Sequence, residues 1–260
     1  MSSPTLEDAW NQLRPHWIIE AADQAVPRTP VYSGLRRFLS PLLRPALRWT
    51  IKGAGRVPRT GPTILAANHL SHIDPIAVIA AARRTTFYLA KEGHFDNALT
   101  RTVMHATGQI ETKRSEGGTD ALASAVSVLN EGRALGIFPE GTRSKRTKAP
   151  YLLPGKTGIA RLAAASPHTT VVPLALVGTR DIMAPKLHKF PRLWKRFEVN
   201  IGQPVTWMEW LAHPNGGNLE AEQLSAISHL DDHEIRAELA GLYRRFTDQI
   251  MGSLRALGAP

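Results

Sequence analysis

Residues 62–82 read PTILAANHLSHIDPIAVIAAA, and this stretch decides the fold class. The opening PTILAA is an apolar run typical of a buried strand. The apolar run IAVIAAA that closes the stretch predicts a helix. Between them, Asp74 is a preferred N-cap residue and Pro75 is favoured at the first helical position. We therefore expect a strand, a polar loop, and a helix that Asp74 caps.

The same alternation of apolar strands and helices continues along the chain. We expect strands at 86–90, 134–139, 171–177 and 197–202, and helices at 119–130, 155–165 and 231–257. A short helix is also expected within residues 1–30. Continuous apolar strands that alternate with helices are typical of a parallel sheet covered on both faces. The sequence thus predicts an α/β fold: a largely parallel mixed sheet flanked by helices, with a helical N-terminal segment and a C-terminal helix.

Composition and charge restrict the function classes. The 260 residues include 43% hydrophobic and 21% charged residues, which is ordinary for a globular protein. Cysteine is absent, so disulfides and thiolate chemistry are excluded. No signal peptide and no transmembrane helix is visible. The net charge of +10 is concentrated in two stretches without acids, 24–73 and 141–180. Such fields attract nucleic acid, anionic lipid or phosphorylated ligands.

Residues 31–50, VYSGLRRFLSPLLRPALRWT, combine an apolar face at roughly helical spacing with four arginines. Pro41 and Pro45 break or kink this pattern. A basic segment with an apolar face can lie in a membrane interface. It can equally be a helix docked on the core of its own domain, and the segment alone does not distinguish the two.

The loop NHLSHIDP is a candidate catalytic site, because ligands of open parallel sheets bind beyond the carboxyl ends of the strands. His69 follows the expected strand, and Asp74 opens the expected helix. A carboxylate on one imidazole nitrogen fixes the tautomer and leaves the other nitrogen free as a general base. Asn68 could help to fix the loop. Ser71 and His72 are weaker candidates, because Ser71 lacks the context of a nucleophile elbow.

The second candidate is FPEGTRS, residues 138–144, which again follows a strand. It supplies the carboxylate of Glu140, backbone amides around Gly141, the hydroxyl of Thr142 and the guanidinium of Arg143. Glycine-containing loops after strands suit phosphate or oxyanion binding, and arginine binds phosphate through two hydrogen bonds. The alternative is a plain loop with a surface arginine. The segment does not match a P-loop.

Three further segments each have two interpretations. Arg114 ends the short β-like run GQIETKR and could meet a phosphate or only solvent. His229 and His233 have the spacing of zinc ligands on a helix, but no third ligand is evident, and we expect no metal. Residues 186–197, KLHKFPRLWKRF, could bind nucleic acid or lipid headgroups, or form a solvated loop.

NHLSHID and FPEGTRS together resemble the glycerolipid acyltransferase family, with its H-x-x-x-x-D and F-P-E-G-T-R-S motifs. Lys156 to Gly158 is similar to the family's K-x-G, and VVPL at 171–174 to its last block. The likeness spans about residues 57–180. The intermediate segment reads IETKR, where the family often has an apolar-acidic-Arg ending, and this leaves the acceptor open.

The resemblance implies a direct acyl transfer. His69 would take the proton from an acceptor hydroxyl that attacks an acyl thioester, and Asp74 would orient His69. The resemblance assigns substrate binding to residues of the later motifs: Arg114, Glu140, Gly141, Thr142, Arg143 and Lys156. The donor would be acyl-CoA or acyl-ACP (acyl carrier protein) as co-substrate, with no metal and no bound cofactor. The family's N-terminal membrane-docking helices favour membrane contact for residues 31–50.

The leading hypothesis is acylation of lysophosphatidic acid to phosphatidic acid in phospholipid synthesis. The alternatives are acylation of glycerol 3-phosphate or another lysolipid, and a basic membrane- or nucleic-acid-binding module without activity. The expected partners are an anionic membrane surface, the lysophospholipid acceptor and the acyl donor, without nucleic acid. We expect peripheral attachment at the cytoplasmic side of the cell membrane, with residues 1–56 in membrane contact and residues 57–260 as the acyltransferase domain. The sequence indicates no function for residues 203–260.

Overall fold

The computed structural model describes residues 4–23, 26, 49–91, 109–112, 119–184, 187, 190–192 and 194–260. These residues form a seven-stranded sheet in the order β1-β7-β6-β2-β5-β3-β4. Its strands are β1 (Trp49–Lys52), β2 (Thr63–Ala67), β3 (Thr86–Lys91), β4 (Gln109–Thr112), β5 (Ala134–Ile137), β6 (Thr170–Val177) and β7 (Phe197–Ile201). Neighbouring strands are parallel except β6 and β7. The predicted mixed, largely parallel sheet is confirmed.

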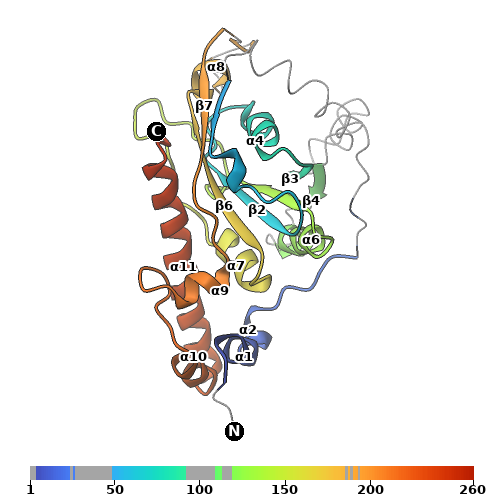
Figure 1. Cartoon of the computed structure of the whole chain (residues 1–260), viewed down its shortest axis with the longest axis vertical. Helices are drawn as coiled ribbons and strands as arrows, with labels where there is room; N and C mark the ends of the chain where they lie inside the picture. The colour runs from blue at the N-terminus through green and yellow to red at the C-terminus, as the bar shows by residue number, and fades with distance from the viewer. Residues whose placement is uncertain are drawn as a thin grey trace.

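Helices flank the sheet and extend beyond one end of it (Figure 1). They are α1 (Leu6–Gln12), α2 (Arg14–Trp17), α4 (Asp74–Ala82), α6 (Thr119–Asn130), α7 (Gly158–Ala165), α8 (Thr179–Met183), α9 (Trp207–Ala212), α10 (Ala221–Ser228) and α11 (Asp232–Ala256), with a 3₁₀ turn η1 (Ala54–Arg56). The long α11 runs along the sheet and is the predicted C-terminal helix. Among the helices described, none combines the length and the apolar character needed to cross a bilayer.

Strand β2 is buried on both faces, which explains its unbroken apolar sequence. Ile64 and Ala66 join one core cluster, which contains residues of α6, α7 and α11. Leu65 and Ala67 join the other, which contains residues of α4 and α8. Successive side chains of a strand point to opposite faces, so a strand between two helical layers needs apolar residues at every position.

The N-terminal helix α1 is fixed to the core by aromatic packing. Trp10 is fully buried, stacks on Trp17 at 5.5 Å between ring centroids and contacts Trp207 at 5.3 Å. The indole N–H of Trp10 donates to the carbonyl of Ala164 at 3.3 Å. The short helix expected within residues 1–30 is therefore present. Of the expected membrane segment 31–50, residues 31–48 lie outside the described residues, and Trp49 begins β1.

β1 and α7 are among the elements that differ from the sequence-based expectation. β1 was not predicted, and it pairs in parallel with β7, about 150 positions later, through Trp49 and Phe197. Helix α7 begins at Gly158 and not at Gly155, because the backbone N–H of Lys156 donates to the carbonyl of Pro139 at 2.8 Å and keeps this segment extended.

The sheet order brings the two sequence motifs together. β2 and β5 are parallel neighbours, with Ala66 opposite Ile137. The loops that follow them, NHLSHI and FPEGTRS, therefore leave the same edge of the sheet side by side. The backbone N–H of Ser144 donates to the carbonyl of His69 at 2.9 Å, which joins the two loops directly.

Candidate active site

His69 and Asp74 form a hydrogen-bonded pair. His69 Nδ1 lies 2.9 Å from Asp74 Oδ2, and since a carboxylate only accepts, Nδ1 carries the proton. The side chain of Asp74 is fully buried and that of His69 is 16% exposed. No described residue bonds to His69 Nε2. The pair has the arrangement of an imidazole base that a carboxylate orients.

Asp74 does not cap its helix, contrary to our expectation. Helix α4 has Ile73 as its N-cap without a side-chain hydrogen bond, and Asp74 is its first residue. The carboxylate instead faces back along the loop, where Oδ2 accepts the backbone N–H groups of Leu70 and Ser71, each at 2.6 Å. Oδ2 thus receives three donors from the loop, whereas Oδ1 has no partner among the described residues and bonds to no amide of the helix. The loop is thus wrapped around the carboxylate that orients His69.

The loop that carries His69 is anchored on both sides. The Asn68 side chain donates to the carbonyl of Leu176 at 3.0 Å and accepts its N–H at 2.7 Å, which ties the loop to β6. Ser71 Oγ donates to the carbonyl of Met183 at 2.9 Å. The ring of Phe138 stacks on His69 at 3.9 Å between centroids. Asn68 therefore fixes the loop, as predicted. The contribution of Phe138 was not predicted, because its sequence position reveals only that it follows β5.

Glu140 holds the two loops together from inside. It is 2% exposed, and its Oε1 accepts the backbone N–H of His69 at 2.6 Å. Oε2 accepts the N–H of Leu153 at 2.8 Å. Burial raises the pKa of Glu140 to about 7, assisted by the charge of Asp74 and opposed by the two amides and Arg146. In this geometry Glu140 positions the backbone of His69, and its carboxylate is buried in the protein.

The other predicted residues of FPEGTRS lie at the surface of the same loop. Gly141 has φ of 70°, and a Cβ there would lie 2.9 Å from the Lys156 side chain, so Lys156 passes over the glycine. Thr142 and Lys156 are exposed. The Arg143 guanidinium contacts the ring of His72. Partial loss of hydration, together with the charge of Arg143, lowers the pKa of His72.

Arg114 lies outside the described residues. The strand before it, β4, is parallel to β3 and ends at the same sheet edge as β2. The possible zinc pair is separated, because His229 is the C-cap of α10 and His233 lies in the first turn of α11. Within the described ranges, no group of three potential ligands could hold a metal ion.

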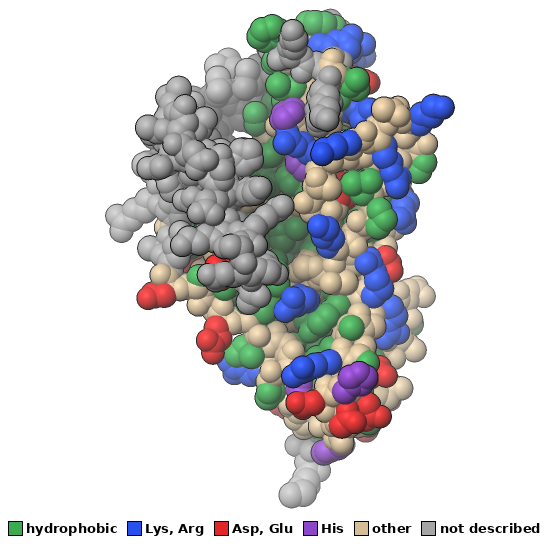
Figure 2. Space-filling view, turned by 180° about the vertical axis from the view of Figure 1, so that it is seen from behind, with side chains coloured by type: hydrophobic (Ala, Val, Ile, Leu, Met, Phe, Trp, Pro, Cys, Tyr) green, Lys and Arg blue, Asp and Glu red, His purple; other side chains and the backbone are tan. Residues whose placement is uncertain are grey.

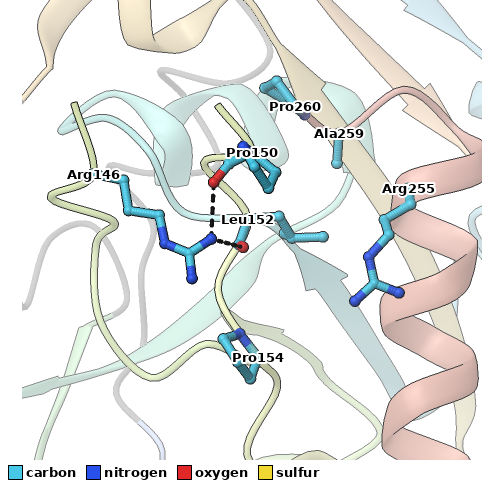
Figure 3. A pocket seen from close by; sticks show the side chains of 7 residues that line it. All are labelled: Arg146, Pro150, Leu152, Pro154, Arg255, Ala259 and Pro260. Atoms are coloured by element: carbon cyan, nitrogen blue, oxygen red, sulfur yellow. Dashed lines mark hydrogen bonds between the residues drawn. The ribbon is translucent and has the colours of Figure 1, made fainter. Parts of the chain in front are cut away.

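A cavity of about 460 Å³ lies beside the loop that Glu140 holds (Figure 3). Its lining is apolar apart from two arginines, and consists of Arg146, Pro150, Leu152, Pro154, Arg255, Ala259 and Pro260. Arg146 donates to the carbonyls of Pro150 at 2.8 Å and Leu152 at 3.2 Å. Arg146 thereby shapes the segment that presents the Leu153 amide to Glu140.

Replacing Glu140 by glutamine is expected to change how stability depends on pH. The folded-state pKa of about 7 exceeds the ordinary 4.5, so the folded protein binds more protons between these values. Stability therefore falls as pH rises through this window. From pH 8 to 5.5 the wild type should gain about 2 kcal/mol of unfolding free energy relative to Glu140→Gln. Urea unfolding at both pH values measures the difference. If the unfolding free energies of the two proteins changed equally with pH, the raised pKa of Glu140 would be contradicted.

Comparison with known proteins gives the class to which this fold and site belong. The family model described as Acyltransferase matches residues 48–177, half of the chain. The chain therefore belongs to the acyltransferase family.

Three relatives share the same printed activity. A chloroplastic 1-acyl-sn-glycerol-3-phosphate acyltransferase, LPAT1, of Arabidopsis thaliana is 28% identical over 54% of this chain and 38% of its own length. The 1-acyl-sn-glycerol-3-phosphate acyltransferase of Borreliella burgdorferi is 28% identical over 50% of this chain and 52% of its own length. The chloroplastic 1-acyl-sn-glycerol-3-phosphate acyltransferase BAT2 of Brassica napus is 30% identical over 54% of this chain and 40% of its own length. The chain spans about two fifths to one half of these relatives.

A solved structure has the same fold. The crystal structure of the 1-acyl-sn-glycerophosphate acyltransferase PlsC from Thermotoga maritima superposes with a TM-score of 0.50 and 19% identity. The match covers 84% of this chain and 82% of that one. At this identity the likeness concerns the fold alone.

Proposed function

We propose that the chain transfers a fatty acyl group from an acyl thioester to the free hydroxyl of lysophosphatidic acid, giving phosphatidic acid. The observation that carries the proposal is the pair of His69 Nδ1 and Asp74 Oδ2 at 2.9 Å, at the carboxyl end of β2. Membership of the acyltransferase family and the printed activity of the three relatives support the reaction and the acceptor.

The proposed reaction is a direct transfer with His69 as general base. The acceptor hydroxyl gives its proton to His69 Nε2 while its oxygen attacks the thioester carbonyl carbon. Asp74 stabilises the imidazolium that forms. When the tetrahedral intermediate collapses, the carbon–sulfur bond breaks and the thiolate takes the proton from His69. One ester and one thiol result, so the balance needs no metal and no redox partner.

The acceptor phosphate is assigned to the loop next to His69. Thr142, Arg143 and Lys156 supply a hydroxyl and two cations at the surface of this loop. The N–H of Gly141 donates to the carbonyl of Phe138 at 2.9 Å, so Gly141 is proposed to contribute by leaving space for the Lys156 side chain over the loop. Cations and free amides are the usual ligands of phosphate. Arg114 is proposed to join them from the end of β4. Glu140 belongs to substrate binding indirectly, because it holds the loop that carries these groups.

The donor is proposed to be acyl-CoA or acyl-ACP, both of which are anionic. Lys145, Arg146 and Lys148 follow the FPEGTRS loop in a stretch without acids. Long-range attraction between opposite charges speeds the encounter of such partners. Because the acceptor is a lipid, we also propose that the reaction occurs at an anionic membrane surface, with peripheral attachment on the cytoplasmic side through the segment 31–50.

An acceptor panel tests the proposal. Purified protein receives radiolabelled acyl-CoA or acyl-ACP with lysophosphatidic acid, glycerol 3-phosphate or lysophosphatidylcholine, and the lipids are separated. We expect labelled phosphatidic acid, with the other two acceptors at least about tenfold slower because they lack either the acyl chain or the exposed phosphate monoester. Faster acylation of glycerol 3-phosphate would refute the assigned acceptor, and no labelled lipid in any arm would refute the function.

A further inference from the structure

Large apolar side chains are exposed at the end of the molecule where α8 and β7 lie in Figure 1. Leu187 is 61% exposed, Phe190 81% and Trp194 68%. Single exposed apolar residues are ordinary on protein surfaces, but three within eight positions are unusual and typical of an interaction surface. None of them contributes to the core clusters.

Basic side chains accompany these residues. Arg192, Lys195 and Arg196 come from the same segment, and the Arg192 guanidinium lies 5.8 Å from the centre of the Trp194 ring. We call residues 187, 190–192 and 194–196 the aromatic–basic segment. Figure 2 shows hydrophobic and basic side chains at this end, further basic side chains along the rest of this face, and most of the acidic side chains toward the opposite end. The nearest acids along the chain are Asp181 and Glu198, and Glu198 is paired with Lys52 at 2.8 Å.

The aromatic–basic segment is connected to the loop that carries the candidate base. The backbone N–H of Arg192 donates to the carbonyl of Ile182 in α8 at 2.9 Å. The next carbonyl, that of Met183, accepts the Ser71 hydroxyl at 2.9 Å and the His72 N–H at 3.2 Å. A surface that binds at this segment therefore lies beside the catalytic loop.

We propose that the aromatic–basic segment inserts into an anionic lipid bilayer and thereby presents the His69 loop to its lipid substrate. Tryptophan and phenylalanine favour the interface between headgroups and acyl chains, and nearby Arg and Lys bind anionic headgroups. This purpose rests on the proposed function, whereas the insertion itself can be measured without turnover. It is a contact additional to the one expected for residues 31–50.

A bilayer fits this surface better than nucleic acid does. Single-stranded nucleic acid needs aromatic faces to stack on and a basic groove, and it gains little from an aliphatic side chain. Here Leu187 is exposed beside the aromatics, and insertion into lipid removes its surface from water as well. The His69 loop, which is proposed to act on a lipid, lies nearby, and this also favours a bilayer as the partner.

Trp194 gives a direct spectroscopic probe. The chain has six tryptophans, of which Trp10, Trp17, Trp207 and Trp210 are buried, Trp49 is partly buried, and Trp194 is exposed. Vesicles of phosphatidylglycerol and phosphatidylcholine brominated in the acyl chains should quench part of the fluorescence and shift it to the blue. Trp194→Phe should remove most of this quenching. Equal quenching in the variant, or none in the parent, would overturn the proposal.

Vesicle co-sedimentation provides the second measurement. The double variant Phe190→Ser/Trp194→Ser should bind the same anionic vesicles about tenfold or more weakly. The matched control is Leu230→Ser, because Leu230 is 40% exposed and lies between α10 and α11 at the far end of the molecule. Raising the salt concentration should weaken binding of the parent. Unchanged binding of the double variant, or stronger binding of the parent to single-stranded DNA than to vesicles, would overturn the proposal.

Turnover separates this proposal from the proposed function. With a short-chain lysophosphatidic acid dissolved below its micellar concentration, the double variant should work within about twofold of the parent. With the same acceptor class held in vesicles it should be about tenfold slower. If neither protein acylates any acceptor, the proposed function fails while vesicle binding still decides the membrane contact. An equal loss on the dissolved acceptor would show a role other than membrane insertion.

Discussion

Replacing His69 by alanine is expected to lower kcat for acyl transfer by about 10²- to 10⁴-fold, the usual contribution of a positioned general base. The side chain is partly exposed at the carboxyl end of β2, and its Nε2 has no partner among the described residues. Steady-state rates with saturating donor and acceptor measure the loss. Urea unfolding of the variant measures the separate cost to stability, because His69 also stacks on Phe138 and bonds to the buried carboxylate of Asp74.

His72 provides the matched control for this prediction. It lies three positions away in the same loop, is exposed and contacts Arg143. His72→Ala should change kcat by no more than about threefold, since removing a solvated side chain leaves the base and its carboxylate in place. A His69→Ala variant that keeps more than a tenth of the parental rate would refute the role of His69. Equal losses in the two variants would show that the loop, and not the imidazole, matters.

Replacing Asp74 by asparagine is expected to reduce kcat by about 10²-fold or more while KM for the acceptor stays within about threefold. The carboxylate is fully buried, so it cannot touch the substrate and acts through His69. Asparagine keeps the shape but loses the negative charge that stabilises the imidazolium, and its amide can favour the wrong tautomer. The split between kcat and KM is the informative measurement.

Stability data complete the test of Asp74. Asp74→Ala removes the acceptor for the N–H groups of Leu70 and Ser71, and each unsatisfied buried donor costs about 1–3 kcal/mol. Urea unfolding should therefore show a larger loss of unfolding free energy for alanine than for asparagine. An Asp74→Asn variant with a raised KM and an unchanged kcat would contradict the positioning role.

Much of the fold followed from the sequence because it depends on local patterns. Continuous apolar strands and the loop between β2 and α4 were recognisable, and parallel order brings their carboxyl ends to one edge. β1 could not be predicted, because its four residues are stabilised by pairing with β7, far away along the chain. α9 was also missed, although Thr206 and Glu209 form a capping box whose spacing is visible in the sequence.

The sequence indicated which residues lie at the candidate site more fully than it indicated what each of them does. The motifs identified His69, Asp74 and Glu140, and β2 and β5 bring them together. The orientation of each carboxylate depends on contacts that the sequence does not reveal. Asp74 faces back to the amides of its own loop, and Glu140 bonds to His69, 71 positions away, and to Leu153, 13 positions away. The roles of Gly141, Thr142, Arg143, Lys156 and Arg114 in substrate binding stay predictions.

The most direct test of the account compares the two products of one reaction. Purified protein is mixed with a labelled acyl thioester and lysophosphatidic acid, and released thiol and phosphatidic acid are both quantified over time. Direct transfer with His69 as base predicts one thiol for each phosphatidic acid, and little thiol without the acceptor. Thiol release that is independent of lysophosphatidic acid and gives free fatty acid would identify a hydrolase and contradict the account.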